Sequence, residues 1–317
     1  FNKNNFNKNN FNKNNFNKNN FNKNNFNKNN FNKNNDNNDF ILIYIVDIMA
    51  NIILKNISMV YNGDKEDFKA IEDINLKINS GEFVSIIGPS GCGKSTLIEI
   101  IAGIKKPSAG EVLINNEVVD KPNSNVGVVF QDYSLFPWMN SYDNLKFAIE
   151  NTNEKLSDDE INKKTIKHLK MVGLENFKNS YPNALSGGMR QRLAISRMFA
   201  TDNEIFLMDE PFGALDAINR IKMQDLLLSL LNDGDKKQTT VYVSHDIDEA
   251  IFLSDRIVVM NSSKSENKSN PGKIKEIINV PFQKLRNREE LFFNKEYISI
   301  KNYIFKLLNP IDLEVKE

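Results

Sequence analysis

The 317-residue sequence contains one cysteine, Cys92, one tryptophan, Trp138, and only two histidines. A single cysteine excludes a disulfide within the chain and indicates a reducing compartment. No apolar run approaches the roughly 18 residues that a membrane span needs, and the longest candidate covers only residues 40–46. The N-terminus also lacks the basic region, apolar core and cleavage site of a secretion signal.

Charge of one sign is not in excess either, because 41 basic residues face 41 acidic ones. The first 35 residues are seven copies of FNKNN, which contain lysine and no acid, so the rest of the chain is slightly acidic. Such a surface does not attract a phosphate backbone. We therefore predict that nucleic acid is not a partner.

The FNKNN repeat is too polar to bury a core, which predicts disorder with some tendency to self-associate. The chain begins with Phe1, its first methionine is Met49, and patterned sequence begins there. We hypothesise that residues 1–48 are translated from upstream repeat DNA and that the native protein begins at Met49. Abundant peptides from residues 1–48 in the natural protein would contradict this. We expect one domain at 49–270 and a short helical tail at 271–317.

A phosphate-binding loop is predicted between an apolar strand, Phe83 to Ile87, and a helix from Lys94 that ends at Gly103. Gly88, four further residues, then Gly93, Lys94 and Ser95 form the GxxxxGKS pattern. Glycines let backbone N–H groups surround a β-phosphate, the lysine reaches the β and γ oxygens, and the serine ligates Mg²⁺. The predicted ATP-binding residues here are Gly88, Pro89, Ser90, Gly91, Cys92, Gly93, Lys94, Ser95 and Thr96. Cys92 is predicted to be present for its small size, not its reactivity.

Two more apolar strands end in polar residues. In IFLMDEP, the strand is predicted to place Asp209 among the ligands of Mg²⁺. Glu210 follows directly and is predicted to polarise a water molecule. In TTVYVSHD, His245 follows a third strand, and this position predicts contact with a γ-phosphate. The other histidine, His168, lies in the polar helical pattern NKKTIKHLK and is predicted to face solvent.

The segment LSGGMRQRLAISRMFA places Ser186, Gly187 and Gly188 before a helix. Ser186 is a natural helix cap, and the glycine N–H groups form a second anion site. A chain with one complete phosphate loop needs a second such site only if that site serves another chain's nucleotide.

These motifs, together with GALD at 213–216, resemble in order and spacing the ATP-binding subunit of ABC transporters over residues 50–260. The resemblance implies a P-loop (RecA-like) α/β fold with a mainly parallel sheet, an antiparallel β sub-domain and a helical signature sub-domain at about 132–199. It also implies an ATPase that uses Mg²⁺ and forms a head-to-tail dimer with a second copy of itself.

The resemblance further assigns roles to single residues. Glu210 is the general base, His245 contacts the γ-phosphate, and Gln131 senses Mg²⁺ and the attacking water. Ser186, Gly187, Gly188 and Asp216 serve the partner's ATP, with Asp216 as the cross-subunit coupler. Tyr61 stacks on adenine, with packing within the strand as the alternative. Mg²⁺ is assigned to Ser95, Gln131 and Asp209.

Trp138 lies in QDYSLFPWMNSYDNL, where the family's helical sub-domain receives its membrane subunit. A lone tryptophan is often core, but here we favour Trp138 and Phe136 as contacts of a membrane permease. The segments FQD, LFPW and DEPFGALDA most resemble the corresponding segments in ATPases of nitrate, sulfonate and taurine importers. That resemblance implies an extracytoplasmic binding protein as an indirect partner. It also implies a peripheral location on the cytoplasmic face of the inner membrane.

Other functions remain possible at this point. A non-transport ABC ATPase acting on DNA or ribosomes is disfavoured because Gly88 and Ser186 are too close for a coiled-coil insertion. A small-molecule kinase leaves LSGGM and GALD unexplained, and export is disfavoured by the absence of an apolar span. The roughly 55 residues after Met260 leave little room for a regulatory domain, and we expect the helical pattern Tyr297 to Leu308 to dock on the same chain.

Overall fold

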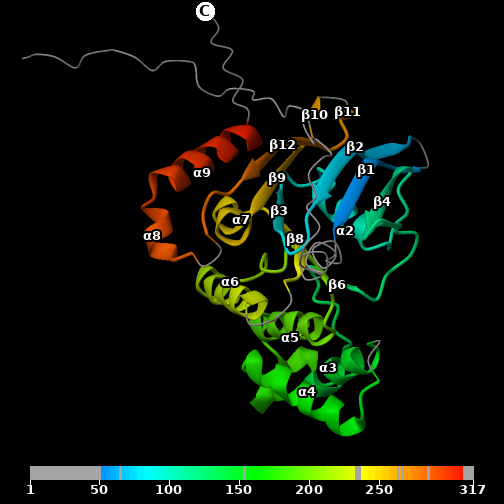
Figure 1. Cartoon of the computed structure of the whole chain (residues 1–317), viewed down its shortest axis with the longest axis vertical. Coiled ribbons are helices and arrows are strands. Elements are labelled where there is room, and N and C mark those ends of the chain that lie inside the picture. The colour runs from blue at the N-terminus through cyan, green and yellow to red at the C-terminus, as the bar shows by residue number, and fades with distance from the viewer. Residues whose placement is uncertain are drawn as a thin grey trace, which may run out of the picture. The chain divides into compact units, whose positions relative to one another are not determined.

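The computed structural model of the chain describes residues 51–309, except 64–65, 153–154, 233–236, 263, 266–267 and 284–285. The hypothesis about residues 1–48 lies outside the described residues. Within the described part, a six-stranded sheet has the order β12-β9-β3-β8-β7-β6 (Figure 1). Its strands are β3 (Phe83–Ile87), β6 (Val126–Val129), β7 (Ile205–Asp209), β8 (Thr239–Ser244), β9 (Arg256–Asn261) and β12 (Lys273–Asn279).

The strands β9, β3, β8, β7 and β6 run parallel, and only β12 is antiparallel, to β9. Every residue of β3 and β8 is buried, as expected for central strands covered on both faces. Because four neighbouring strands are parallel, the residues that follow β3, β8, β7 and β6 emerge at one edge of the sheet.

A second sheet is antiparallel, with the order β2-β1-β4-β5. It consists of β1 (Ile52–Tyr61), β2 (Phe68–Ile78), β4 (Ala109–Ile114) and β5 (Glu117–Val118). Its apolar face shares a core with α2 (Lys94–Ile101) and one face of the central sheet, so this layer fixes the position of α2. A separate two-stranded sheet pairs β10 (Lys264–Ser265) with β11 (Lys268–Ser269).

A helical layer with its own core follows β6 (Figure 1). It contains α3 (Ser141–Glu150), α4 (Asp158–Met171), the 3₁₀ turns η1 (Glu175–Phe177) and η2 (Pro182–Ala184), and α5 (Gly187–Ala200). Ser157 and Glu160 form a reciprocal capping box that begins α4. The predicted antiparallel and helical parts and the mainly parallel sheet are thus all present.

The prediction for His168 is wrong. His168 is only 8% exposed and lies in the last turn of α4, where the hydroxyl of Ser196 in α5 donates to its carbonyl at 3.0 Å. Burial lowers the pKa of the imidazole from 6.5 to about 4. The side chain is therefore neutral in the folded chain, and the backbone carbonyl of His168 takes part in the contact between α4 and α5.

The remaining helices are α6 (Ala217–Asn232), α7 (Ile247–Leu253), α8 (Arg288–Phe292) and α9 (Lys295–Leu308). Helix α9 packs on α7 and β9 and buries Tyr297 and Ile304, so the predicted docking of the tail is confirmed. Among residues 51–309 as described, no helix combines the length and the apolar character needed to span a bilayer.

Candidate functional site

The loop between β3 and α2 adopts a backbone that glycine permits. Gly91 and Gly93 have φ angles of 82° and 94°. A Cβ atom at Gly93 would lie 2.2 Å from the Cγ2 atom of Ile71, so the fold itself requires glycine there. Cys92 is buried beneath the loop, and burial raises the pKa of its thiol, in keeping with a packing role.

Lys94 begins α2 and is only 7% exposed. Its Nζ atom donates to the carbonyl of Gly88 at 2.9 Å and to that of Pro89 at 3.3 Å. The ammonium group is therefore held inside the curve of the loop. Phosphate oxygens that entered the loop would meet both this charge and the backbone N–H groups at the start of α2.

Asp209, the last residue of β7, accepts a hydrogen bond from Ser95 at the start of α2, and burial raises its pKa. Its Oδ1 atom is buried and has no hydrogen-bond partner. A buried carboxylate oxygen without a partner, beside a serine hydroxyl, is a pair of oxygen donors that fits a Mg²⁺ ion. Among the described residues no cluster of three or more His, Cys, Asp or Glu could hold a metal unaided.

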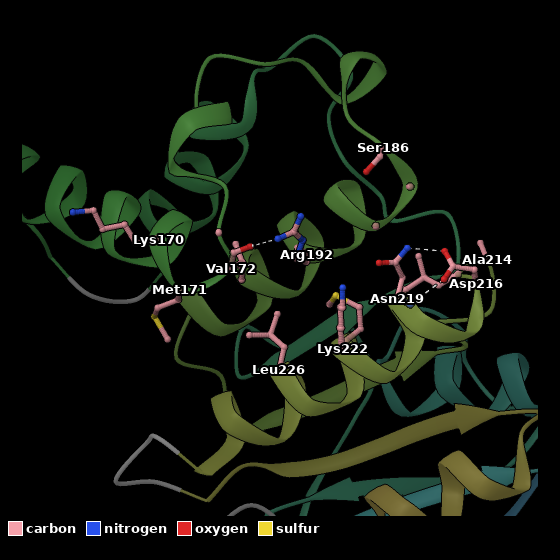
Figure 2. A pocket seen from close by; sticks show the side chains of 15 residues that line it. Lys170, Met171, Val172, Ser186, Arg192, Ala214, Asp216, Asn219, Lys222 and Leu226 are labelled. Atoms are coloured by element: carbon pink, nitrogen blue, oxygen red, sulfur yellow. Dashed lines mark hydrogen bonds between the residues drawn. The ribbon is translucent and has the colours of Figure 1, made fainter. Parts of the chain in front are cut away.

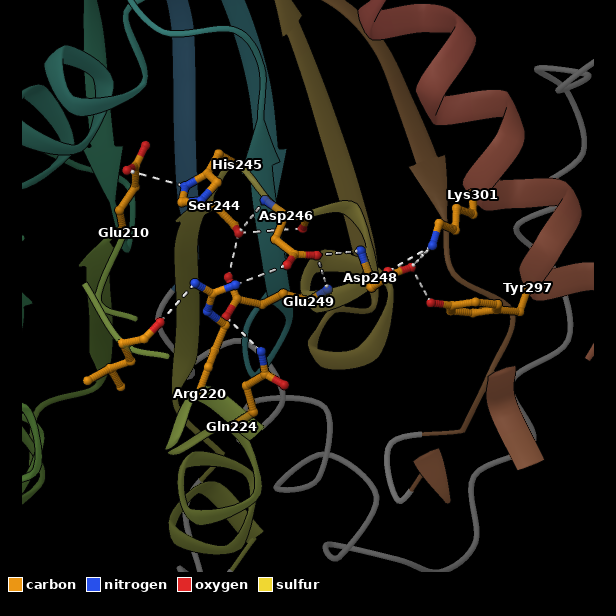
Figure 3. A network of polar contacts seen from close by, with 11 residues as sticks. Glu210, Arg220, Gln224, Ser244, His245, Asp246, Asp248, Glu249, Tyr297 and Lys301 are labelled. Atoms are coloured by element: carbon orange, nitrogen blue, oxygen red, sulfur yellow. Dashed lines mark hydrogen bonds and ion pairs between the residues drawn. The ribbon is translucent and has the colours of Figure 1, made fainter. Parts of the chain in front are cut away.

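Glu210 lies between two cationic or basic groups. Its Oε1 atom is 3.9 Å from Nζ of Lys94, and its Oε2 atom is 3.5 Å from Nδ1 of His245 (Figure 3). Its φ angle is 45°, an uncommon value for a residue other than glycine. Its amide nevertheless donates to the carbonyl of Val243 in β8, at 3.1 Å. The strained turn thus directs the carboxylate toward the phosphate loop without breaking the sheet.

The two remaining predicted residues of this site also lie near it. Gln131 is exposed and follows β6 on the same edge of the sheet as Asp209. The hydroxyl of Tyr61 lies 3.2 Å from that of Thr96, in the first turn of α2. Lys105 donates to the Tyr61 hydroxyl at 3.0 Å and sits 4.9 Å from the ring centroid. Adenine stacking by Tyr61 stays a prediction.

A separate pocket of about 720 Å³ lies between the helical layer and α6 (Figure 2). Its lining includes all four residues predicted to serve the partner's nucleotide, namely Ser186, Gly187, Gly188 and Asp216, and none of residues 88–96. Ser186 caps α5 by accepting from the amide of Met189 at 3.3 Å. The chain therefore presents two separate candidate sites, one around the phosphate loop and one around Ser186.

Gly187 and Gly188 are not required by the fold of this chain. Neither has a positive φ angle, and a Cβ atom at either position would meet no atom closer than 3.8 Å. The backbone of both glycines is therefore open to close approach from outside the chain.

Exposed aromatic side chains mark a third feature, on the loop before α3. Trp138 is 69% exposed, so its interpretation as core is wrong. The Trp138 and Phe136 rings have centroids 5.5 Å apart, and Phe136 meets Phe147 edge-on at 5.2 Å. Fully buried Asn144 accepts from the amide of Phe136 and donates to the carbonyls of Phe136, Met139 and Asn140. These hydrogen bonds hold the aromatic loop, residues 136–138, in place within the chain.

Comparison with known proteins agrees with this geometry. A family model described as ABC transporter matches residues 71–213. The bicarbonate transport ATP-binding protein CmpD of Synechococcus elongatus is 38% identical over 257 residues, which cover 81% of this chain and 90% of the relative. The chain belongs to the ABC transporter family. It is an ATPase of that family.

Other relatives extend this result. The nitrate import ATP-binding protein NrtD of the same organism is 38% identical to this chain over 234 residues, which cover 74% of this chain and 82% of NrtD. The ATP-binding cassette MJ0796, solved as a post-hydrolysis dimer bound to ADP and Pi, superposes with a TM-score of 0.63 at 35% identity. That match covers 73% of this chain and all of MJ0796. CbiO1 from Clostridium perfringens, part of the transporter complex cbiONQ, gives a TM-score of 0.61 at 28% identity, over 80% and 94% of the chains.

Sequence reasoning did not single out several residues that line the second candidate site. The pocket around Ser186 is also lined by Lys170, Arg192, Asn219 and Lys222. In the sequence these are ordinary polar positions on helices, and only the packing of α4, α5 and α6 brings them together. Arg220, which contacts the segment next to Asp216 and the residue after His245, was missed for the same reason.

Proposed function

We propose that two copies of this ABC ATPase form a head-to-tail dimer with two shared ATP sites. The observation that carries the proposal is the pair of glycines at 187 and 188, which this chain leaves uncrowded and does not itself require. A phosphate held in the loop of a second copy can approach their N–H groups only if no Cβ intervenes. The dimeric form in which MJ0796 was solved supports the same arrangement.

Hydrolysis in this dimer uses the residues at the sheet edge. Lys94 holds the phosphates, Glu210 accepts a proton from the attacking water, and His245 contacts the γ-phosphate from the other side. Ser95, Asp209 and Gln131 are the residues that would hold Mg²⁺, which would offset negative charge that develops on the phosphates. Asp216 couples nucleotide occupancy of one ATP site in the dimer to the other ATP site.

The aromatic loop at 136–138 is the proposed contact with a membrane permease. Aromatic side chains that are exposed yet held rigid lose little conformational entropy when a partner covers them. Closure of the dimer would displace this loop together with α3 and α5. The ABC ATPase would then act from the cytoplasmic face of the inner membrane as a peripheral subunit, without touching the solute.

We infer import of a small solute as the process that this subunit energises. The relatives named for bicarbonate and nitrate support a small anion, which agrees with the resemblance of LFPW and its neighbours to nitrate, sulfonate and taurine importers. An importer of this kind also needs an extracytoplasmic binding protein. The alternative of action on DNA or ribosomes has no observation in its favour.

The dimer is tested with the Glu210→Gln chain, which should bind ATP without hydrolysing it. Light scattering should report a monomer alone and a dimer with ATP and Mg²⁺. Adding Gly187→Ala should weaken dimerisation at least tenfold, leave ATP binding to the monomer within twofold, and preserve or raise the melting temperature. Equal dimerisation with and without Gly187→Ala would refute the role of the glycines.

The transport function is tested by isolating the tagged chain from native membranes in mild detergent and identifying what accompanies it by mass spectrometry. A polytopic membrane protein with an extracytoplasmic binding protein is the expected result, and ligand screening of that binding protein identifies the solute. Ribosomes or nucleic acid without a membrane subunit would overturn the transport assignment.

A further inference from the structure

Arg220 on α6 lies between the two candidate sites of the chain. Its Nη2 atom donates to the carbonyl of Leu215 at 3.1 Å, and its backbone amide donates to the carbonyl of Asp216 at 2.9 Å. Its Nη1 atom lies 3.4 Å from Oδ2 of Asp246 (Figure 3). One side chain thus touches the segment that lines the pocket around Ser186 and the residue that follows His245.

Asp246 divides its carboxylate between two tasks. The Oδ1 atom caps α7 by accepting from the amides of Asp248 and Glu249, at 2.9 and 3.1 Å. The Oδ2 atom is left for Arg220. Its own amide donates to the hydroxyl of Ser244 at 3.0 Å, so the backbone on both sides of His245 is tied to this carboxylate residue.

Helix α7 is held from its other sides by the C-terminal tail. Lys301 in α9 donates to Asp248 at 2.8 Å, and the hydroxyl of Tyr297 donates to the same carboxylate. Arg286 donates to the carbonyls of Phe252 and Ser254 at the end of α7, at 2.8 Å each. Because α7 is fixed at both ends, a displacement delivered by Arg220 falls on the short segment 244–246 that carries His245.

We propose that Arg220 is a positioning residue that couples the pocket for the partner's nucleotide to His245 in the chain's own ATP site. This proposal rests on the dimer proposed above. When the partner's ATP closes on Ser186 and Asp216, the carbonyl of Leu215 moves, the guanidinium follows it, and Asp246 resets His245. Hydrolysis at one site then depends on occupation of the other, which is a coupling free energy between sites.

The residue type suits this task. A planar guanidinium offers separate N–H groups to two acceptors in fixed relative directions, so it can hold Leu215 and Asp246 together. Lysine carries the same charge at a single point and would satisfy one acceptor or the other. The conservative variant therefore separates coupling from charge.

The test compares ATP hydrolysis by the full-length chain as a function of ATP concentration in five forms, namely wild type, three single variants and one double variant. Wild type should be cooperative, with a Hill coefficient above 1. Arg220→Met should bring the Hill coefficient to about 1 and lower kcat at least tenfold, while ATP binding to the monomer stays within twofold. Arg220→Lys should fold and pack as wild type does, but its ATP hydrolysis should lack cooperativity. Asp246→Asn keeps a good helix cap and loses the ion pair, so it should reproduce the effect of Arg220→Met, and the double variant should show no further loss.

Arg288→Met is the matched control. Arg288 also joins α6 to α7, since it pairs with Asp225 at 2.9 Å and lies 3.7 Å over the ring of Phe252, but it touches neither Leu215 nor Asp246. The Hill coefficient of the Arg288→Met chain should equal that of wild type. A cooperative Arg220→Met chain, or an equal loss in Arg288→Met, would overturn the coupling role while leaving the dimer intact. A wild-type chain that hydrolyses ATP as a monomer without cooperativity would overturn both.

Discussion

Truncating Trp138 to alanine distinguishes a contact surface from a core. The indole is 69% exposed, and its ring contact within the chain is with Phe136. An aromatic side chain buries about 150–250 Å² when it is fully covered. About 100–170 Å² therefore remain available to a partner, and about 50–80 Å² are already covered by the chain.

These areas give different free energies for the two roles. At about 25 cal/mol per Å², full coverage of the exposed part contributes about 2.5–4 kcal/mol to binding, as an upper bound. Its loss would weaken association with a membrane subunit on the order of 10²-fold. The free energy of unfolding should fall by only about 1–2 kcal/mol, against about 3–5 kcal/mol for a buried tryptophan.

The assay has three readouts on the same purified variant. Co-isolation from native membranes should fall, ATP hydrolysis in solution should stay within twofold of wild type, and urea unfolding should show the small destabilisation. Phe293→Ala is the control, because Phe293 is a more exposed aromatic, at 86%, placed after α8. Undiminished membrane association, or unfolding at the cost expected for a core residue, would refute the reasoning.

Three further predictions concern the site and the helical layer. Glu210→Gln should retain ATP binding and lose hydrolysis by about 10² or more in a phosphate-release assay, as expected when a positioned base is removed; turnover near wild type would assign the base elsewhere. Asp209→Asn should raise the Mg²⁺ concentration that gives half-maximal hydrolysis at least tenfold, because the buried Oδ1 loses its charge; an unchanged requirement would remove Asp209 from the metal shell. His168 has a folded pKa of about 4, below its unfolded value of 6.5, so its stabilising effect is complete above pH 6.5 and is lost as pH falls toward 4. That loss is up to about 3 kcal/mol of the free energy of unfolding. In urea unfolding between pH 6.5 and 4, the His168→Gln chain should lose less stability than wild type. An identical pH profile for the two chains would show that His168 is not the source of the pH dependence.

Much of the ATP site could be predicted because each part is local in the sequence. An apolar strand followed by a polar residue, as at Asp209 or His245, specifies both the buried segment and the group at its end. Parallel strands bring their carboxyl ends to one edge, so separate local patterns add up to one site. The segment at Ser186 was recognisable in the same way, as a cap and two glycines that open a helix.

Other features depended on contacts between segments far apart in the chain. His168 has polar neighbours in the sequence, yet it is buried in the folded chain, where its carbonyl accepts a hydrogen bond from Ser196 of α5. Arg220 and Asp246 are 26 residues apart, and no spacing rule relates them. Trp138 is exposed although its neighbours in the sequence are apolar, and the backbone of its loop is hydrogen-bonded to Asn144 in α3.

The chemistry of this chain follows from residue types at short spacings, because these decide which atoms can bind phosphate, hold Mg²⁺ and activate water. Which of these groups meet was settled by the three-dimensional packing of the chain. It placed Ser186 and Asp216 in a pocket apart from the phosphate loop, joined that pocket to His245 through Arg220, and left Trp138 uncovered. These outcomes depend on how helices pack on the sheet, and that packing is a property of the whole chain.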